Sequence, residues 1–475
     1  MTPASIRFGT DGWRALMADE FTFPNLRRVA LATAQFIKAN PSPKGKGIVV
    51  AYDRRFLARN FAEEAARLFK NNGLQVSLSA TPMPTPALSV SVAHRSAAWG
   101  IMITASHNPA LYNGFKIKDC HGRSAPPEVT QGIEQNISSE APSANLQPEP
   151  MSLFDDRRVY EKYLRSRIDW PLLKNFKAKI VFDHLYGVAS GIPEALLKGS
   201  RLQIHSLHSE ADPLFGGLHP EPIESNLDTL KKTVRKDRAL VGIAFDGDAD
   251  RLGIVDDQGQ YLTPHQVFPL LVLHCIEHKK WKGKIVQSVS LGALAERIAQ
   301  ANHLPFEEVP VGFKHVAERM LREDILAGGE ESGGYAVRGG LPERDGILSG
   351  LLFLEMLMAQ RKTPSQLLRD MEKRFGRARF KRVDMPLEKS IEDKASFVQF
   401  VTNKLPERLA GQAVKEVRTH DGVKIFLRSG AWVLLRPSGT EPLVRTYAES
   451  DSWAQTGKLL TWAQQTVRRY FGKTS

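Results

Sequence analysis

The residues best suited to chemistry lie in Thr104–Pro109, which reads Thr-Ala-Ser-His-Asn-Pro, with Lys116 ten residues after Ser106. The apolar run Ala97–Ile103 precedes this stretch and predicts a buried strand, and the Asn-Pro pair predicts a turn that ends it. Ser106 is therefore expected at a strand end, where open α/β sheets place their ligands. A serine there could act as a nucleophile or carry a phosphoryl group. An ordinary Asn-Pro turn with a solvated serine is the alternative.

Three aspartates alternate with small residues directly after a second predicted strand, Leu240–Phe245. Asp246, Asp248 and Asp250 would share one face of a strand, but in a loop softened by glycine and alanine they could surround one hard cation. Such a crowded negative cluster is costly unless a cation neutralises it. Mg²⁺ is the expected ion, because it takes a few carboxylates and leaves room for a phosphate oxygen. Arg251 occupies the sixth position, where an EF-hand requires glycine, so an EF-hand is excluded and a solvated acidic turn remains the alternative.

Two further stretches have compositions suited to holding a polyol and a phosphate. Gly328–Gly334 contains four glycines and presents Glu330 and Ser332 two residues apart, an arrangement that suits neighbouring sugar hydroxyls. Arg436–Pro442 reads Arg-Pro-Ser-Gly-Thr-Glu-Pro, and its Ser-Gly-Thr turn, flanked by arginine on one side and Arg445 on the other, predicts a phosphate nest. A flexible glycine turn and a hairpin loop with surface arginines are the respective alternatives.

Two glycine-containing loops complete the candidate set. Phe8–Arg14 contains two glycines and an Asp-Gly pair, which predict a tight loop from which Arg14 projects. A simple turn with a surface arginine is the alternative. Val311–Lys314 is expected to be a loop before a helix.

Strands and helices alternate along most of the chain, which predicts βαβ units with a largely parallel sheet. The expected strands cover residues 46–53, 74–79, 97–103, 179–183, 202–207, 240–245 and 284–289, and the expected helices cover 25–39, 61–71, 159–168, 294–301, 315–322 and 347–359. From about residue 374 the pattern changes to strands at 380–383, 422–427, 431–435 and 444–449, followed by a helix at 453–470. This change predicts a smaller α+β domain at the end of the chain.

The length of 475 residues is too great for one core and predicts three or four domains. The proline-rich segment Glu140–Pro150 predicts a linker. We expect domains at 1–145, 151–256, 257–373 and 374–475. In that order they contain the Ser106 loop, the aspartate loop, the Glu330 loop and the Arg436 loop.

The amino-acid composition limits the classes of function that the protein can have. The apolar fraction of 42% and the charged fraction of 25% are those of a globular protein. The formal net charge of +13 can attract anionic partners, and a solvated basic surface is the alternative. There is no dense basic block interleaved with aromatics, so we expect no nucleic-acid partner. The two cysteines form no CxxC pair, which predicts free thiols in a reducing compartment. No secretory leader or membrane-spanning run is seen, so we expect a cytoplasmic protein with no membrane partner.

The four motifs Thr-Ala-Ser-His-Asn-Pro, Asp-Gly-Asp-Ala-Asp-Arg, Gly-Glu-Glu-Ser-Gly-Gly and Arg-Pro-Ser-Gly-Thr-Glu-Pro occur in this order along the chain. Together they resemble the α-D-phosphohexomutase family, which includes phosphoglucomutase, phosphomannomutase and phosphoglucosamine mutase. The resemblance extends over essentially the whole sequence. It implies an α/β protein with three consecutive mixed-sheet α/β domains and a smaller C-terminal α+β phosphate-binding domain around a central cleft.

The resemblance also implies roles for individual residues. Ser106 would carry a phosphoryl group and, with Asp246, Asp248 and Asp250, hold one Mg²⁺ per active site. Catalytic roles at the reaction centre are implied for Arg14, His107, Lys116 as a candidate proton carrier, and Arg251. Substrate binding is implied for Gly312, Lys314, Glu330, Ser332, Arg436, Ser438, Gly439, Thr440 and Arg445.

Some positions distinguish branches of the family. Relatives that act on mannose or glucosamine phosphates tend to have histidine where Gly334 stands, and Val311–Lys314 is similar to the glucose-preferring branch. Ser290 stands where some relatives have lysine. The resemblance therefore implies an isomerase that interconverts glucose 1-phosphate and glucose 6-phosphate, with mannose phosphates as further substrates. The reaction would pass through a hexose 1,6-bisphosphate, and glucose 1,6-bisphosphate would be the activator.

Three other functions remain open at this stage. A glucose 1,6-bisphosphate synthase would use the same phosphoserine with a sugar bisphosphate as donor. A sugar-phosphate-binding protein without catalysis would use only the binding loops. A phosphatase of the aspartyl-phosphate type would use Asp246 or Asp248 as its nucleophile and would not need Ser106. The expected partners are small hexose phosphates, and the sequence does not distinguish a monomer from a dimer.

Overall fold

The computed structural model describes residues 6–143, 150–439 and 441–472. The chain divides into two compact units. The first unit comprises Met1–Thr263, Gly312–Asp324 and Ser332–Ser365, and the second comprises Pro264–Val311, Ile325–Glu331 and Gln366–Ser475. Parts of the predicted linker, residues 144–149, and Thr440 lie outside the described residues.

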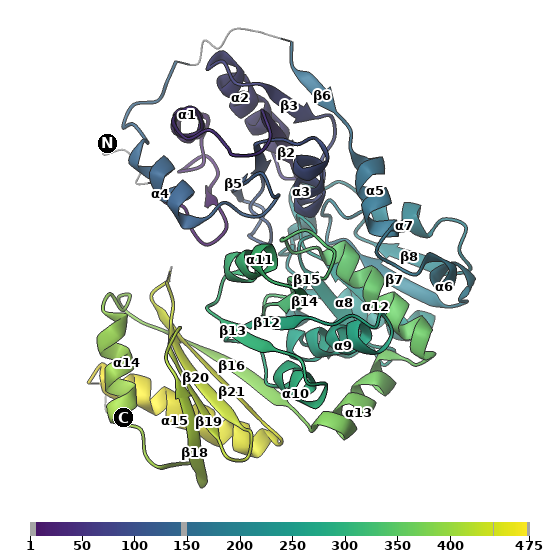
Figure 1. Ribbon diagram of the computed structural model, residues 1–475, viewed down its shortest axis with the longest axis vertical. Coiled ribbons are helices and arrows are strands. Elements are labelled where there is room, and N and C mark those ends of the chain that lie inside the picture. The colour runs from purple at the N-terminus through teal and green to yellow at the C-terminus, as the bar shows by residue number, and fades with distance from the viewer. Residues whose placement is uncertain (1–5, 144–149, 440, 473–475) are drawn as a thin grey trace. The chain divides into compact units, whose positions relative to one another are not determined.

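The first unit contains two sheets with flanking helices, coloured purple to teal in Figure 1. The first sheet has the order β1 (Trp13–Leu16), β5 (Tyr112–Lys118), β4 (Trp99–Ile103), β2 (Ile48–Tyr52), β3 (Val76–Ser79) and β6 (Ser152–Phe154). Its helices are α1 (Phe23–Ala39), α2 (Ala58–Asn71), α3 (Thr85–His94) and α4 (Pro127–Gln135). Strands β4, β2, β3 and β6 run parallel, as the alternating pattern predicts, whereas β5 is antiparallel to both β4 and β1.

The second sheet of this unit holds the aspartate loop. Its order is β11 (Tyr261–Leu262), β10 (Leu252–Val255), β9 (Val241–Phe245), β7 (Lys179–Asp183) and β8 (Gln203–Leu207). Its helices are α5 (Arg157–Arg165), α6 (Trp170–Asn175), α7 (Ile192–Leu197) and α8 (Asp228–Asp237), with short 3₁₀ turns at Phe215–Gly217 and Glu224–Asn226. The first unit also includes α11 (Phe313–Arg322), β15 (Tyr335–Val337) and the buried helix α12 (Gly346–Gln360).

The second unit combines a parallel α/β part with an antiparallel sheet. In the α/β part, β12 (Lys284–Ser288) pairs in parallel with β13 (Phe306–Val309) and β14 (Ile325–Gly329), next to α9 (Pro264–Glu277) and α10 (Leu294–Ala301). Helix α13 (Pro364–Phe375) leads to the second part. There the sheet order is β16 (Arg379–Pro386), β21 (Leu443–Ser450), β20 (Trp432–Pro437), β19 (Val423–Leu427), β18 (Gln412–Arg418) and β17 (Arg408–Leu409), with α14 (Lys394–Asn403) and α15 (Trp453–Tyr470). Helix α15 packs on β21, β16 and β20 through Leu459, Ala463 and Val467.

These sheets confirm the predicted fold class, three mixed α/β units followed by an α+β domain. The antiparallel strand β5 was not predicted, because its Asn113-Gly114 pair is typical of a turn. Pairing with strands on both sides keeps this pair extended. Helix α11 begins at Phe313, so Phe313 and Lys314 are helical and the expected loop ends at Gly312. Within the described residues, no helix has the length and apolar character needed to cross a membrane.

The buried N-cap of α12 makes stability depend on pH. Oδ1 of Asp345 accepts hydrogen bonds from Leu348 N (2.8 Å) and from the Tyr160 hydroxyl (2.9 Å). Burial raises the pKa of Asp345 to about 6 from an ordinary value of 3.8. The folded state therefore binds the proton more tightly than the unfolded state, so this group stabilises the fold below about pH 4 and loses that contribution as the pH rises through about 6. Two pKa units correspond to about 3 kcal/mol.

We expect Asp345→Asn, which keeps Oδ1 as an acceptor, to remove this trend. Between pH 4 and pH 7 the midpoint of thermal unfolding should fall more steeply in the wild type than in the variant. Asp393→Asn is the matched control, because Asp393 caps α14 through Ser396 N but is exposed. Parallel profiles for the wild type and Asp345→Asn would contradict the raised pKa.

Candidate active site

Ser106 lies in the connection between β4 and β5, and its backbone is held in an unusual conformation. Its φ is 53°, in the left-handed region that a serine rarely adopts. Ser106 N donates to Thr104 Oγ1 (2.9 Å), and that hydroxyl donates to Asp53 Oδ2 (2.5 Å). A strained conformation persists only where the surrounding contacts determine it. The buried Asp53–Thr104 pair supplies one such set of contacts.

Arg55 supplies a second set of contacts that hold Ser106 in this conformation. Its side chain is fully buried and pairs with Asp53 at 3.2 Å. Its guanidinium donates to four backbone carbonyls of the same connection: Ser106 O (2.6 Å), Asn108 O (2.6 Å), Pro109 O (2.8 Å) and Tyr112 O (3.0 Å). Because a planar guanidinium has a fixed donor geometry, these contacts set the shape of the loop that presents Ser106.

The three aspartates lie in the hairpin that joins β9 to β10. Their ligand oxygens lie within 4.8 Å of one another, and all three residues are buried. Ser106 Oγ donates to Asp246 Oδ2 at 2.9 Å, so the predicted serine and the predicted metal loop come together. The approach requires Gly247, because a Cβ at that position would lie 2.6 Å from Ser106 O.

The electrostatics of this cluster fit a cation. Burial, and then the charges of Asp250 and Asp248, hold the pKa of Asp246 well above its ordinary value. Burial opposes ionisation of Asp248 as well, but Lys116 and the Thr85 hydroxyl hold its pKa below the ordinary value. Asp248 Oδ1 and Asp250 Oδ1 are buried and have no hydrogen-bond partner in the part of the chain that the structure describes. Unpaired carboxylate oxygens at this density are the donor set that Mg²⁺ prefers.

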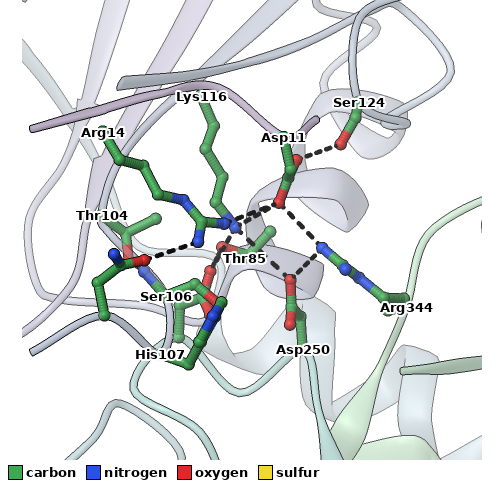
Figure 2. Close-up of polar contacts among 12 residues, drawn as sticks. Asp11, Arg14, Thr85, Thr104, Ser106, His107, Lys116, Ser124, Asp250 and Arg344 are labelled. Carbon is green, nitrogen blue, oxygen red and sulfur yellow. Dashed lines mark hydrogen bonds and ion pairs between the residues drawn. The ribbon is translucent and has the colours of Figure 1, made fainter. Parts of the chain in front are cut away.

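A network of cations faces the cluster, as Figure 2 shows. Lys116 Nζ lies 2.8 Å from both Asp248 Oδ2 and Asp11 Oδ2. Arg14 donates to Asn108 Oδ1 (2.9 Å) and lies 3.5 Å from Asp11. The strand pairing brings these side chains together, because β5 places Lys116 opposite Met102 of β4, and β1 places Arg14 opposite Gly114 of β5.

Lys116 and Asp11 carry opposite charges beside the cluster, whereas His107 is neutral. Burial opposes the charge on Lys116, but Asp11 and Asp248 raise its pKa overall, so it remains an ammonium. Burial likewise opposes the charge on Asp11, but Lys116 and the other surrounding cations hold its pKa well below the ordinary value. Burial, then Arg251 and Arg14, hold the pKa of His107 well below the ordinary value, so its imidazole is neutral. In this state Lys116 can donate a proton and neutralise charge, and its role as a proton carrier stays a prediction.

Arg251 and His107 lie at the edge of the cluster. The backbone N of Arg251 donates to Asp246 Oδ1 (3.0 Å), and its Nε lies 3.8 Å from Asp250 Oδ1. Its guanidinium pairs with Glu221 (3.1 Å), which lies 4.0 Å from His107 Nε2. The structure therefore brings together every residue for which a catalytic role was predicted.

Two of the predicted sugar residues, Gly312 and Lys314, lie close to the Asp11 loop. Lys314 lines a cavity of about 190 Å³ together with Thr10, Asp11 and Ser124. A Cβ on Gly312 would lie 3.1 Å from Thr10 Cγ2. The hydroxyl of Ser332 is buried and has no hydrogen-bond partner among the described residues. Glu330 belongs to the second unit, where it is buried.

The predicted phosphate nest lies in the second unit. Arg436 on β20 and Arg445 on β21 are opposite each other in the antiparallel pair. Arg436 Nε pairs with Asp421 (2.8 Å), and Arg445 pairs with Glu441 (2.7 Å). Ser438 Oγ accepts from Glu441 N (3.2 Å), and Gly439 is exposed beside Lys394, whose Nζ would lie 3.5 Å from a Cβ at position 439. Thr440 is outside the described residues, so its role stays a prediction.

The residues at the site that were not predicted include Asp11, Arg55, Thr85 and Arg344. Asp11 was visible as part of an Asp-Gly turn, and Arg344 as a charged residue directly before the buried helix α12. Thr85 opens α3, and its hydroxyl donates to Asp248 Oδ2 at 2.6 Å. No local signal marks Thr85 or Arg55, because their partners lie 163 and about 50 residues away.

Comparison with known proteins agrees with this architecture. The sequence matches four family models: phosphoglucomutase/phosphomannomutase α/β/α domain I over residues 5–144, domain II over 158–259, domain III over 263–375 and the C-terminal domain over 398–461. These matches define the class, the phosphohexomutases, which are isomerases. The chain belongs to the phosphoglucomutase/phosphomannomutase family.

Individual relatives cover nearly the whole chain. A probable phosphoglucosamine mutase of Methanosphaera stadtmanae is 31% identical over 446 residues, 94% of each chain. A phosphoglucomutase/phosphomannomutase of Thermococcus kodakarensis is 28% identical over 448 residues, again 94% of each chain. The crystal structure of a putative phosphomannomutase from Thermus thermophilus superposes with a TM-score of 0.86 at 34% identity, covering 98% of this chain and 100% of that one.

The charge on Asp248 should be essential for metal binding. Asp248→Asn keeps the shape and can still accept from Thr85, so the fold should survive. The loss of one ligand charge should weaken Mg²⁺ binding by at least the roughly 10–100-fold that is lost when a residue that orients a metal ligand is changed. Titration calorimetry with Mg²⁺ and the Mg²⁺ dependence of activity measure this effect. Asp228→Asn, which removes an exposed carboxylate from α8, is the control. Full activity of Asp248→Asn in chelator-treated buffer would rule out the metal role.

Proposed function

We propose that the protein is a phosphohexomutase that interconverts glucose 1-phosphate and glucose 6-phosphate, with mannose phosphates as further substrates, through a phosphoserine at Ser106. The observation that carries this proposal is the contact between Ser106 Oγ and the buried aspartate cluster, beside Lys116 and Arg14. Phosphoryl transfer depends mainly on positioning and charge neutralisation, and this arrangement supplies both.

In the proposed reaction, Ser106 Oγ is the leaving and returning oxygen. The bond between phosphorus and Ser106 Oγ breaks, a bond from phosphorus to a hydroxyl oxygen of the hexose monophosphate forms, and the hydroxyl proton ends on Ser106 Oγ. The bisphosphate turns around, and the reverse transfer of its other phosphate completes the isomerisation. Mg²⁺ held by Ser106, Asp246, Asp248 and Asp250 would neutralise phosphoryl charge. Arg14 and Lys116 stabilise the charge on the transferring oxygens.

The remaining predicted residues would hold the sugar and its distal phosphate. Arg436, Ser438, Gly439, Thr440 and Arg445 are proposed to bind the phosphate that does not react, and Glu330, Ser332, Gly312 and Lys314 to bind the sugar. The cross-strand arginine pair supports the first role, and the unpaired buried hydroxyl of Ser332 supports the second. We propose the domain limits 1–145, 151–256, 257–373 and 374–475 as the segments that carry these loops.

A hexosamine phosphate is the second candidate substrate. Several relatives with similarity over nearly the whole chain are named phosphoglucosamine mutase. The glucose proposal rests on Gly334 and Val311–Lys314, which are similar to the glucose-preferring branch. A glucose 1,6-bisphosphate synthase is the third candidate, since it would use the same serine and the same bisphosphate.

The serine role is tested by phosphosite mapping. After incubation with glucose 1,6-bisphosphate, the purified chain should carry one phosphate on Ser106. Ser106→Ala should carry none and should lose activity by about 1,000-fold or more, as other covalent nucleophiles do. Ser225→Ala, an exposed serine in the second sheet region, should behave as the wild type. The assignment would be contradicted if Ser106→Ala retained more than about a tenth of wild-type activity. A tenfold loss of activity corresponds to an increase of only ~1.4 kcal/mol in the activation barrier.

The substrate is tested by supplying glucose, mannose and glucosamine 1-phosphates separately with a trace of the matching bisphosphate. We expect the highest kcat/KM with glucose 1-phosphate. A higher value with glucosamine 1-phosphate would transfer the proposal to that substrate. A further tube with glucose 6-phosphate and fructose 1,6-bisphosphate tests the synthase. Stoichiometric glucose 1,6-bisphosphate there, with little isomerisation elsewhere, would favour the synthase, because the bisphosphate would then leave before it turns around.

A further inference from the structure

Arg344 contacts two carboxylates of the active site from a segment that no motif marks. Its Nη2 lies 2.7 Å from Asp250 Oδ2 and 2.9 Å from Asp11 Oδ2. Figure 2 shows the side chain reaching across to both. The arginine side chain is 7% exposed, and its guanidinium lies 5.6 Å from the ring centre of Phe313. Arg344 is thus held in place as part of the site.

The path of this side chain depends on Gly334. A Cβ at position 334 would overlap Cδ of Arg344 and would lie 2.8 Å from its Cγ. Both approaches are closer than van der Waals contact allows, so a side chain at 334 and the observed path of Arg344 exclude each other. Because the clashing atoms belong to the middle of the stem, Arg344 would have to leave this path to avoid a Cβ at position 334. Gly334 therefore permits the contact with Asp250.

The contact between Arg344 and Asp250 decides how many oxygens Asp250 can offer to a metal ion. Its Oδ2 is engaged by Arg344, with Lys116 farther away at 3.5 Å, while its Oδ1 has no hydrogen-bond partner among the described residues. Asp248 repeats the pattern, since its Oδ2 is engaged by Lys116 and Thr85 and its Oδ1 is unpaired. Each of these two aspartates thus presents a single oxygen.

A carboxylate that offers a metal ion only one oxygen suits Mg²⁺ better than Ca²⁺. Mg²⁺ requires near-ideal octahedral geometry, whereas Ca²⁺ takes six to eight ligands and accepts carboxylates through both oxygens. We propose that Gly334 and Arg344 act as a unit that restricts Asp250 to one-oxygen ligation and so gives the site its preference for Mg²⁺ over Ca²⁺. The inference deepens the proposed function and rests on its metal site. Arg344 acts here as a positioning residue, through Asp250.

The test is the ratio of dissociation constants for the two ions. The full-length chain is freed of metal with a chelator and titrated calorimetrically with Mg²⁺ and with Ca²⁺, without substrate. In Arg344→Ala the ratio should shift toward Ca²⁺ by about tenfold or more, the size of effect found when a residue that orients a metal ligand is removed. Arg344→Lys, which can still engage one carboxylate oxygen, should recover part of the preference. An unchanged ratio in Arg344→Ala overturns the proposal.

The steric link is tested by a double-mutant cycle. Gly334→Ala alone should shift the ratio in the same direction as Arg344→Ala. In the double variant Gly334→Ala/Arg344→Ala the clashing stem atoms are gone, so the ratio should equal that of Arg344→Ala. If the two effects add instead, Gly334 does not act through Arg344 and the proposal fails. The double variant keeps the test valid even if Gly334→Ala alone is unstable.

Two controls isolate the effect. Gly457→Ala places a methyl group in open space within α15, and Arg338→Ala removes an arginine paired with Asp324 on the surface. Both should keep the wild-type ratio, and a shift in either would overturn the proposal.

Failure of this inference can be distinguished from failure of the proposed function. If the wild type isomerises hexose phosphates but Arg344→Ala keeps the wild-type ratio of the Mg²⁺ and Ca²⁺ dissociation constants, only this inference fails. If the wild type binds Mg²⁺ without isomerising any hexose phosphate, the proposed function fails and the ratio still decides the role of Arg344.

Discussion

Burial of three carboxylates within 4.8 Å of one another is the constraint on which the first unit depends. Burial, and then the repulsion of neighbouring like charges, raise the pKa of Asp246. The protein compensates with nearby cations: Lys116 and Arg344 share Asp11 as a bridge, and Arg251 lies at the edge of the cluster. Oδ1 of Asp248 and Oδ1 of Asp250 have no hydrogen-bond partner among the described residues, and a divalent cation there would complete the charge balance.

Two hairpins bring Ser106 and the three aspartates together. One connects β4 and β5 and presents Ser106, and the other connects β9 and β10 and presents the aspartates. They come from different sheets and meet at Gly247, where only a hydrogen fits beside Ser106 O. Arg55 and Asp53 stabilise the first hairpin. The strained φ of Ser106 is thus maintained by buried contacts within the protein.

Membership of the phosphoglucomutase/phosphomannomutase family defines the class of reaction but not which hexose phosphate is the substrate. Relatives over nearly the full length have names that refer to glucosamine, glucose and mannose phosphates. Discrimination between such similar hexoses depends on a few polar contacts to one or two hydroxyls.

The sequence alone predicted many of the helices and strands and most of the residues for which catalytic or metal-binding roles are proposed. Ser106, Lys116 and the three aspartates were predicted because each lies in a short motif beside a predicted strand, and local patterns record such features. Strand β5 was missed, because its Asn-Gly pair indicates a turn and only pairing with two neighbours keeps it extended.

The tertiary structure decided the residues that hold the reacting groups in place. Arg55 contacts carbonyls about 50 residues away, Thr85 contacts an aspartate 163 residues away, and Arg344 contacts one 94 residues away. The role of Gly334 follows only from the path of the Arg344 stem. Such contacts depend on how distant segments pack, and a local sequence pattern carries no information about which distant side chain will lie opposite.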